Sequence, residues 1–205
     1  MKLGDNVNLF KLTTPGIDYS TMPQTLTATG AFTDVPNLEV SEGFLPYELI
    51  DPFWSDGADK KRWMAIPNNG SHNTPQEQIV FSENGAWEFP VGTVLIKHFD
   101  YPIDDTNPNI TRKVETRFSI KANDGTFYFL TYNWNDQQTE AYLQEVGVDE
   151  PIQITTVGGG TRQVDWHFPS NSECLSCHNS ASTGTLGLRT RYLNSDYDYS
   201  THTPG

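Results

Sequence analysis

The chain has 205 residues, of which 36% are hydrophobic and 12% are aromatic. This length suits one domain and is too short for two of ordinary size, and the aromatic content argues against intrinsic disorder. Thirteen basic against 26 acidic side chains give a formal net charge of -13, which excludes a nucleic-acid binder that follows phosphates with a basic face. No apolar stretch has the length of a membrane span.

The first 30 residues are rich in Thr, Pro and Gly and show little periodicity. This composition predicts an extended arm or linker over residues 1–30, followed by a single β-rich domain over residues 31–205. The first residues also lack the apolar run and small-residue cleavage site of a secretion signal. Either the protein stays in the cytoplasm, or a signal is missing from this chain.

Strands are predicted in the middle of the chain, where β-branched and aromatic residues are concentrated. The three clearest segments are residues 93–101, 115–121 and 126–132. The sequence Asn-Asp-Gly at residues 123–125 joins the last two in a hairpin, because Asn and Gly tolerate the positive φ of a tight turn.

Two further elements are predicted before the C-terminal region. Residues 152–157 and 162–168 resemble a second hairpin around the three glycines at 158–160, and residues 136–145 suit a short helix. The expected fold is therefore mainly β, an antiparallel sandwich or irregular barrel with one or two short helices.

A capping box marks the start of a C-terminal helix. Ser170 is followed three residues later by Glu173, so the hydroxyl accepts from a helix amide while the carboxylate reaches back to the cap. The helix opened by this pair carries Cys174 and Cys177.

The strongest motif is Cys174-Leu175-Ser176-Cys177-His178, a C-x-x-C-H sequence that is the attachment signature of c-type haem. Two thiols one helical turn apart reach the two vinyl groups on one edge of the porphyrin and form thioethers. The adjacent His178 then comes under the ring with a nitrogen aimed at the iron. These are the only two cysteines of the chain, so we expect one covalently attached haem c bound by Cys174, Cys177 and His178.

Three other interpretations of the cysteine pair have less support in the sequence. A dithiol redox site of thioredoxin type needs a βαβ context, which the sequence lacks. A zinc site needs four ligands, and His167 and His178 complete the set only with the wrong spacing. A disulfide within so short a loop gains little entropy.

Several blocks upstream of this motif resemble one family, the exported bacterial c-type cytochromes typified by a Shewanella di-haem protein. The blocks are residues 89–94 (FPVGTV), 115–117 (ETR), 132–141 (YNWNDQQTEA) and 166–170 (WHFPS). The resemblance covers about residues 28–195 and implies a haem module of an exported protein, which recurs fused to quinoprotein-dehydrogenase-like modules. The separate N-terminal cytochrome domain of that family is missing, so a single haem is expected.

A low-spin electron carrier needs a second axial ligand on the iron, usually His or Met. Several residues of the chain are candidates for it. His167 lies just before the cap of the haem helix and is our first choice, with hydrogen bonding to a haem propionate as its alternative role. His98 lies in a predicted core strand, where a buried, hydrogen-bonded imidazole is as good an interpretation. Met64 follows these two as core filler or ligand. The remaining candidates are Met22, His72 and His202.

Two acidic groups are candidate calcium sites. Asp51, Asp56 and Asp59 form one, and Asp104 with Asp105 the other. Neither has the spacing of an EF-hand loop, which favours solvated surface.

The sequence thus predicts a mono-haem c-type cytochrome that transfers electrons by an outer-sphere route and catalyses no reaction. Because covalent haem attachment is completed outside the cytoplasm, we expect a periplasmic or extracellular location. The acidic balance favours a redox partner with a basic docking face, or serves solubility. Two other hypotheses are a haem enzyme or redox or gas sensor with an open distal site, and a structural subunit of a haem-containing assembly or dehydrogenase-like module.

Overall fold

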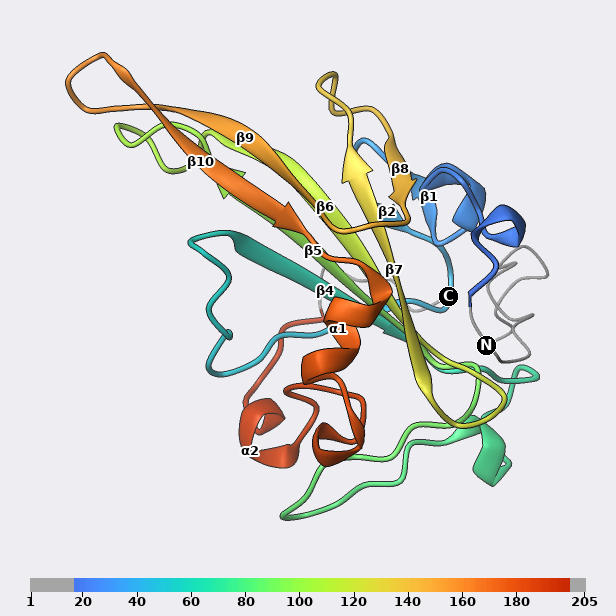
Figure 1. Ribbon diagram of the computed structural model, residues 1–205. Helices are drawn as coiled ribbons and strands as arrows, with labels where there is room; N and C mark the ends of the chain where they lie inside the picture. The colour runs from blue at the N-terminus through green and yellow to red at the C-terminus, as the bar shows by residue number, and fades with distance from the viewer. Residues whose placement is uncertain (1–16, 200–205) are drawn as a thin grey trace.

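A six-stranded antiparallel sheet with the strand order β3-β4-β5-β6-β7-β8 forms the centre of the computed structural model, which describes residues 17–199 (Figure 1). The strands are β3 Leu45–Pro46, β4 Asp59–Ala65, β5 Val94–Pro102, β6 Thr111–Lys121, β7 Phe127–Trp134 and β8 Ala141–Gln144. The expectation of a mainly β, antiparallel fold is confirmed.

Smaller elements lie on either side of this sheet. They are the pair β1 Phe32–Asp34 and β2 Glu39–Val40, the hairpin β9 Val148–Thr155 and β10 Thr161–Phe168, the helices α1 Asn171–Cys177 and α2 Thr190–Leu193, and four 3-10 turns at Tyr19–Thr21, Thr27–Thr29, Pro75–Glu77 and Ser180–Ser182. Within residues 17–199, no helix is both long enough and apolar enough to cross a membrane.

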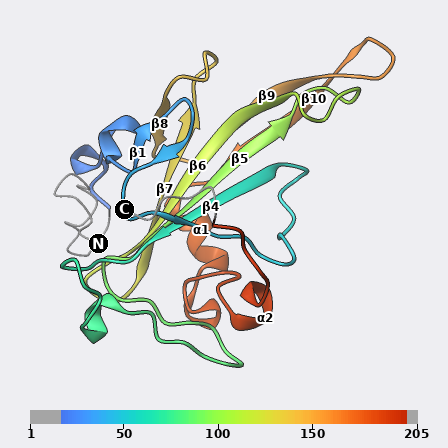
Figure 2. The same ribbon diagram turned by 180° about the vertical axis from the view of Figure 1, so that it is seen from behind.

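The two faces of the large sheet are covered by opposite ends of the chain. Side chains alternate along a strand, so on β5 Ile96 and His98 face one way while Lys97 and Phe99 face the other. We call the first the core face, since Ile96 belongs to its apolar cluster, and the second the cavity face, since Lys97 and Phe99 line a cavity there. N-terminal segments lie over the core face, and α1 with the loops that follow it lies over the cavity face (Figures 1 and 2).

The second half of the expected N-terminal arm packs on the core face. Met22 and Leu26 are buried in the apolar cluster there. The Leu26 amide donates to the Ala141 carbonyl at 2.8 Å, and the Leu143 amide donates to the Gln24 carbonyl at 3.0 Å. Residues 17–30 are thus held on edge strand β8, while residues 1–16 of the expected arm lie outside the described residues.

Both predicted hairpins are present. The turn at residues 123–125 joins β6 to β7, with Gly125 at a φ of 81°. The three-glycine turn joins β9 to β10, with Gly159 at a φ of 78°. Only glycine adopts this left-handed region at little cost. The glycines in the sequence therefore predicted both turns correctly.

The predicted helix over residues 136–145 is wrong. The chain turns sharply after β7 and then forms edge strand β8, which pairs with β7 from Trp134 opposite Ala141 to Thr131 opposite Gln144. Gln138 has a φ of 59°, which no helix tolerates. Its side-chain oxygen accepts from the Lys113 amide at 2.6 Å, so contacts with distant β6 select the turn over the local helical preference.

Candidate functional site

Helix α1 begins at the predicted capping box and is held on β7. The Ser170 hydroxyl accepts from the Glu173 amide at 3.4 Å, and the Glu173 carboxylate accepts from the Ser170 amide at 2.7 Å. The Asn171 side chain accepts from the Phe129 amide of β7 at 2.8 Å. The cap therefore determines where the helix starts, and Asn171 determines which strand it covers.

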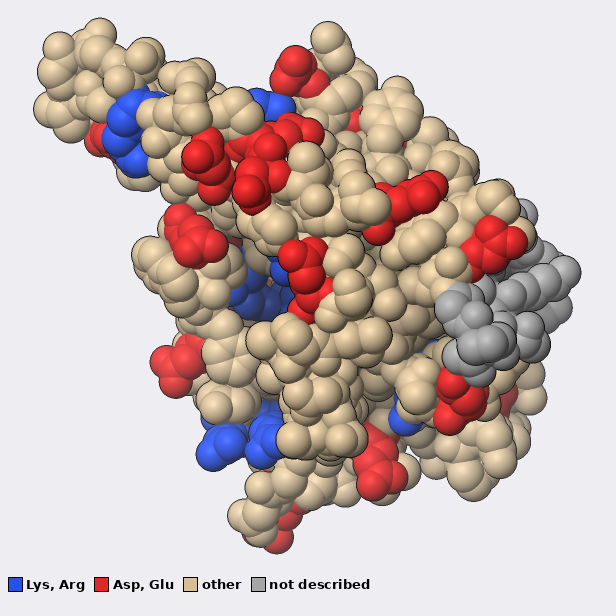
Figure 3. All heavy atoms as spheres, viewed as in Figure 1, with Lys and Arg blue, Asp and Glu red and all other residues tan. Residues whose placement is uncertain are grey.

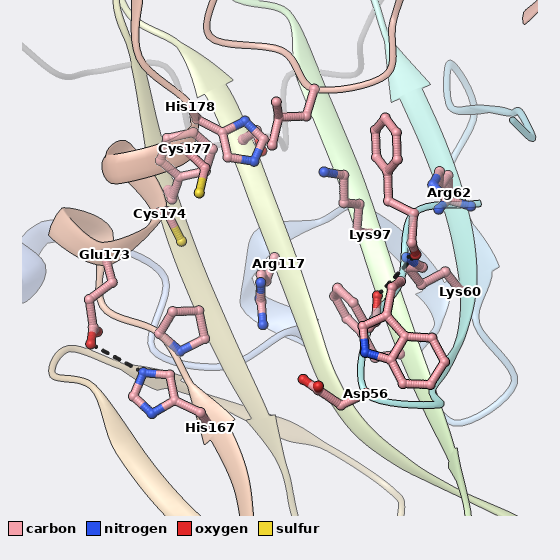
Figure 4. Close-up of a pocket in the computed structure, with 18 of the residues that line it drawn as sticks. Asp56, Lys60, Arg62, Lys97, Arg117, His167, Glu173, Cys174, Cys177 and His178 are labelled. Carbon is pink, nitrogen blue, oxygen red and sulfur yellow. Dashed lines mark hydrogen bonds and ion pairs between the residues drawn. The ribbon is translucent and has the colours of Figure 1, made fainter. Parts of the chain in front are cut away.

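The two cysteines and His178 come together at the end of this helix. Cys174 is buried and Cys177 is exposed, and neither forms a disulfide. Figure 4 shows both sulfur atoms on the same side of α1, facing the cavity, with the His178 ring next to them. The structure thus brings together the three residues of the C-x-x-C-H motif on one wall.

The orientation of His178 is set by a single hydrogen bond. Its Nδ1 lies 2.9 Å from the Gly184 carbonyl oxygen, so Nδ1 carries the proton and Nε2 keeps its lone pair. Burial lowers the pKa of His178 to about 4, which keeps the ring neutral near pH 7. The ring also packs on Phe129, with 4.7 Å between the centroids.

The partner carbonyl depends on a glycine at position 184. Gly184 has a φ of 75°, and a Cβ at this position would overlap the Phe127 ring. The residue therefore needs both the conformational freedom and the small size of glycine. The sequence analysis did not predict this residue as part of the site, although Gly184 ends a run of small residues, 180–184, that follows the motif.

A cavity of about 520 Å³ opens in front of the motif. Its lining combines aromatic side chains, four cations and the C-x-x-C-H residues: Phe53, Trp54, Phe99, Phe129 and Trp166; Lys60, Arg62, Lys97 and Arg117; and Cys174, Cys177 and His178. The space-filling view shows Lys and Arg atoms within a hollow of a face that otherwise carries many Asp and Glu side chains (Figure 3). The cavity thus has a positive floor in an acidic protein.

Three of these cations stand side by side on neighbouring strands. Arg62 of β4 pairs in register with Lys97 of β5, and Lys97 pairs with Arg117 of β6. We call Arg62, Lys97, Arg117 and the nearby Lys60 the cation row. Burial, together with Arg117 and Arg62, lowers the pKa of Lys97 to about 7, and burial with Arg62 lowers the pKa of Lys60 to about 8. Like charges directly opposite each other destabilise a sheet, so the row has a cost that local folding does not explain.

Of the four side chains in the cation row, Arg117 alone has a carboxylate partner among the residues that the structure describes. Buried Glu115 accepts from the Arg117 guanidinium and, at 3.0 Å, from the Trp166 indole nitrogen. Burial disfavours the charge of Arg117, but Glu115 outweighs it and raises the pKa. Within residues 17–199, Lys60, Arg62 and Lys97 have no ion pair.

His167, the predicted second axial ligand, lies at the rim of the cavity. Its Nδ1 is 2.6 Å from an Asp149 carboxylate oxygen, and its Nε2 is 3.2 Å from Glu173. The hydrogen bond to Asp149 raises the pKa of His167, and Glu173 adds to the effect. The structure places His167 beside the motif, and Asp149 is a partner that the sequence did not indicate.

His98 lies on the core face, on the far side of the sheet from the cysteines. Its side chain is fully buried, its Nδ1 accepts from the Thr116 hydroxyl at 2.8 Å, and its Nε2 donates to Asp100 at 3.3 Å. Burial lowers its pKa, so the imidazole is neutral and both nitrogens are satisfied. This position fits the interpretation of His98 as a buried, hydrogen-bonded core histidine.

The other candidate ligands are scattered. Met22 is buried on the core face, and Met64 packs in the apolar cluster that contains Cys174. His72 lies in a loop, with Nδ1 2.9 Å from the Glu77 carbonyl oxygen. His202 lies outside the described residues.

The rival interpretations of the cysteine pair gain no support from the geometry. Burial raises the pKa of Cys174 to about 11, whereas a reactive dithiol needs a lowered thiol pKa. Over residues 17–199, no three His, Cys, Asp or Glu side chains gather as a metal site. Of the candidate calcium ligands, Asp105 forms an ion pair with Arg162 at 2.9 Å.

The cation row is the main feature of the site that sequence reasoning missed. The local signal for it is the spacing of Lys60 and Arg62, which are separated by one residue in β4 and so lie on the same face of the sheet. Their proximity to Lys97 and Arg117 depends on strand pairing over about 35 to 55 residues of chain, which periodicity cannot reveal. Comparisons with models of protein families, with curated proteins and with solved structures find no match to this chain.

Proposed function

We propose that this protein is a mono-haem c-type cytochrome, with haem c bound covalently through Cys174 and Cys177 and with His178 as an axial ligand. The observation that carries the proposal is the orientation of His178 beside two cavity-facing sulfurs. Iron-ligating histidines almost always donate their other ring nitrogen to a carbonyl or carboxylate, and the Nδ1 contact with Gly184 supplies that bond. Nε2 is then the nitrogen available to iron.

The residues around the motif fit a haem group. The cavity of about 520 Å³ adjoins both sulfurs, and Phe99, Phe129 and Trp166 provide apolar walls for a porphyrin. When bound, haem supplies an iron that changes between the ferric and ferrous states by one electron. The chain's own part is to hold the ring, to set the ligands and to limit access of water.

Electron transfer is the role that this arrangement serves best. Cys177 is exposed while Cys174 is buried, so the attachment edge reaches the protein surface, where a partner can approach. Acidic side chains surround the hollow (Figure 3), which favours a redox partner with a basic docking face. Covalent attachment also implies a periplasmic or extracellular location, where the domain acts alone or as a module of a larger dehydrogenase-like protein.

His167 is the proposed second axial ligand. Asp149 on Nδ1 is the carboxylate partner that a ligating histidine requires. If the protein carries haem, ligation through Nε2 would replace the longer of the two contacts, that with Glu173 at 3.2 Å.

A second candidate function is a haem enzyme or sensor with an open distal position. The observation in its favour is that both nitrogens of His167 are held by carboxylates, which stabilises the protonated ring, and a protonated imidazole cannot bind iron. The ferric absorption spectrum separates the two functions, since an open position gives a high-spin spectrum and two imidazoles give a low-spin one.

The central test is the intact mass of the protein matured in a host that attaches haem c, together with a pyridine haemochrome assay. We expect one haem per chain, and none when Cys174→Ala and Cys177→Ala are combined. Ser176→Ala, in the same helix between the two cysteines, is the matched control and should mature normally. An unmodified polypeptide from the wild-type gene would refute the proposal.

A further inference from the structure

The cation row has the features of a site built for anions. Arg62 is 6% exposed, and its Nε has no hydrogen-bond partner within residues 17–199. Burying a charge without a partner is costly, and Arg62 lies beside Lys97 in register. A buried guanidinium with an open donor next to a second cation favours the binding of a negatively charged ligand.

The row lies across the cavity from the cysteines. Helix α1 packs on β7, whereas Arg117, Lys97 and Arg62 come from β6, β5 and β4, one, two and three strands away. With about 4.8 Å between neighbouring strands, Arg62 belongs to a strand about 14 Å from β7. Figure 4 shows the same order, with Cys174 and Cys177 at one side, Arg117 and Lys97 between, and Lys60 and Arg62 at the other.

Carboxylates already present in the cavity lining do not neutralise the row. Asp56, Asp165 and Glu173 are exposed, and none forms an ion pair with Lys60, Arg62 or Lys97. Lys60 donates only to a neutral group, the Phe53 carbonyl. Among residues 17–199, the row therefore has no ion-pair partner for Lys60, Arg62 or Lys97, which leaves it open to a negatively charged ligand.

We propose that Arg62, Lys97 and Lys60 bind a pair of carboxylates, and that in the mature protein these are the two propionates of haem. This inference rests on the proposed function, because in haem the propionates leave the edge opposite the two vinyl groups. If haem is attached at Cys174 and Cys177, the propionates would leave the edge away from α1, and the residues of the row on β4 and β5 would be the ones to hold them. The row thus orients the ring and keeps its acid groups inside the protein, and guanidinium and ammonium groups are the usual partners of carboxylates.

The test compares the holoprotein of Arg62→Gln, Lys97→Gln and the double variant with the wild type. Resonance Raman spectra report hydrogen bonding to propionates through their bending mode. We expect this band to shift in each single variant and further in the double variant, and the reduction potential to fall in the same order because carboxylate charge is no longer neutralised. Lys61→Gln is the matched control, since Lys61 is on the same strand but pairs with Asp100 on the core face, and it should leave the band in place.

An unchanged band in the double variant would overturn the assignment. A changed ferric spin state in Lys97→Gln would also do so for that residue, because it would make the amine an iron ligand. The source of the carboxylates is tested by adding inorganic phosphate at constant ionic strength. If phosphate raises the melting temperature of the wild-type holoprotein but not of the double variant, the row is open to free anions and does not hold the propionates.

Failure of the proposed function has a different signature. If the wild-type chain carries no haem, the propionate assignment falls with it, and the same phosphate titration on the unmodified chain tests the anion site alone. Stabilisation of the wild type, lost in the double variant, would keep the site with a free anion as its ligand. No stabilisation would refute both parts.

Discussion

The two faces of the central sheet differ in whether their polar side chains have partners within the chain. On the core face, a chain of hydrogen bonds runs from the Trp134 indole to Thr116 at 3.0 Å, from Thr116 to His98 at 2.8 Å, and from His98 to Asp100 at 3.3 Å. Lys61 closes the chain on Asp100 at 3.1 Å. Each polar group in this network has its partner inside the chain.

The cavity face is unbalanced by comparison. Over residues 17–199, its cation row has one ion-paired carboxylate, Glu115, for four basic side chains. His98 and Lys97 are neighbours in sequence, yet one completes a closed network and the other lines a cavity without an ion pair. A satisfied buried network indicates structure, whereas unbalanced charge beside a cavity indicates a binding site. Whether a histidine or a cation has its partners within the chain is therefore a better guide to its role than its residue type.

The largest expected effects come from replacing either of two histidines, His98 on the core face and His178 at the cavity, by alanine. His98→Ala should lower the free energy of unfolding by roughly 2–4 kcal/mol, because it leaves a void and removes a partner from Thr116 and Asp100. If the protein carries haem as proposed, the ligation of the iron should remain that of the wild type. His178→Ala should do the reverse, with loss of the axial ligand and a smaller change in stability. Urea denaturation and ferric spectra measure the two effects, and a spin change in His98→Ala would contradict the separation of the faces.

A second prediction concerns the rim of the cavity. If His167 ligates the haem iron as proposed, His167→Ala should turn the ferric spectrum from low-spin to high-spin and let added imidazole bind. Asp149→Asn keeps the ligand but weakens its carboxylate partner, so it should stay low-spin with a higher reduction potential. Equal spectra for wild type and His167→Ala would exclude His167 as the ligand.

A glycine pair sharpens the comparison between the site and a solvent-exposed turn. Gly184→Ala should destabilise the protein by about 1–3 kcal/mol, because it places a Cβ at a positive φ and against Phe127. It should also reduce haem content by displacing the carbonyl that orients His178. Gly158→Ala is the control, since nothing lies within 4 Å of a Cβ there. A similar effect of both changes on thermal melting would argue against a specific role for Gly184.

The smallest expected effect is a pH dependence that arises on the core face. Burial alone would raise the pKa of Asp100, but the hydrogen bond from His98 and the ion pair with Lys61 lower it to about 2. Since the folded pKa is below the ordinary value of 3.8, this carboxylate contributes stability above about pH 4 that is lost as the pH falls toward 2.

Chemical denaturation between pH 2 and 5 measures this contribution. Asp100→Asn should flatten the dependence, and Lys61→Gln, which removes one of the two partners, should reduce it in part. If the unfolding free energy of Asp100→Asn depends on pH as steeply as that of the wild type, other carboxylates are responsible for the acid sensitivity.

The sequence by itself determined the elements whose signals are local. The hairpin turns at residues 123–125 and 158–160 need glycine, the Ser170–Glu173 capping box starts α1, and the cysteine spacing matches one helical turn. In each case the decisive contacts lie within a few residues, so the pattern and the structure have the same cause.

Only the tertiary structure decided the features that depend on strand pairing. Edge strand β8 replaced a predicted helix because β7 and residues 17–30 offer hydrogen bonds that a helix cannot use. The cation row, the Gly184 carbonyl beside His178 and the Asp149 partner of His167 likewise join positions that are distant or unremarkable in sequence. A sequence states which charges exist, but register across a sheet decides which of them face each other, because a one-residue shift moves every side chain to the opposite face.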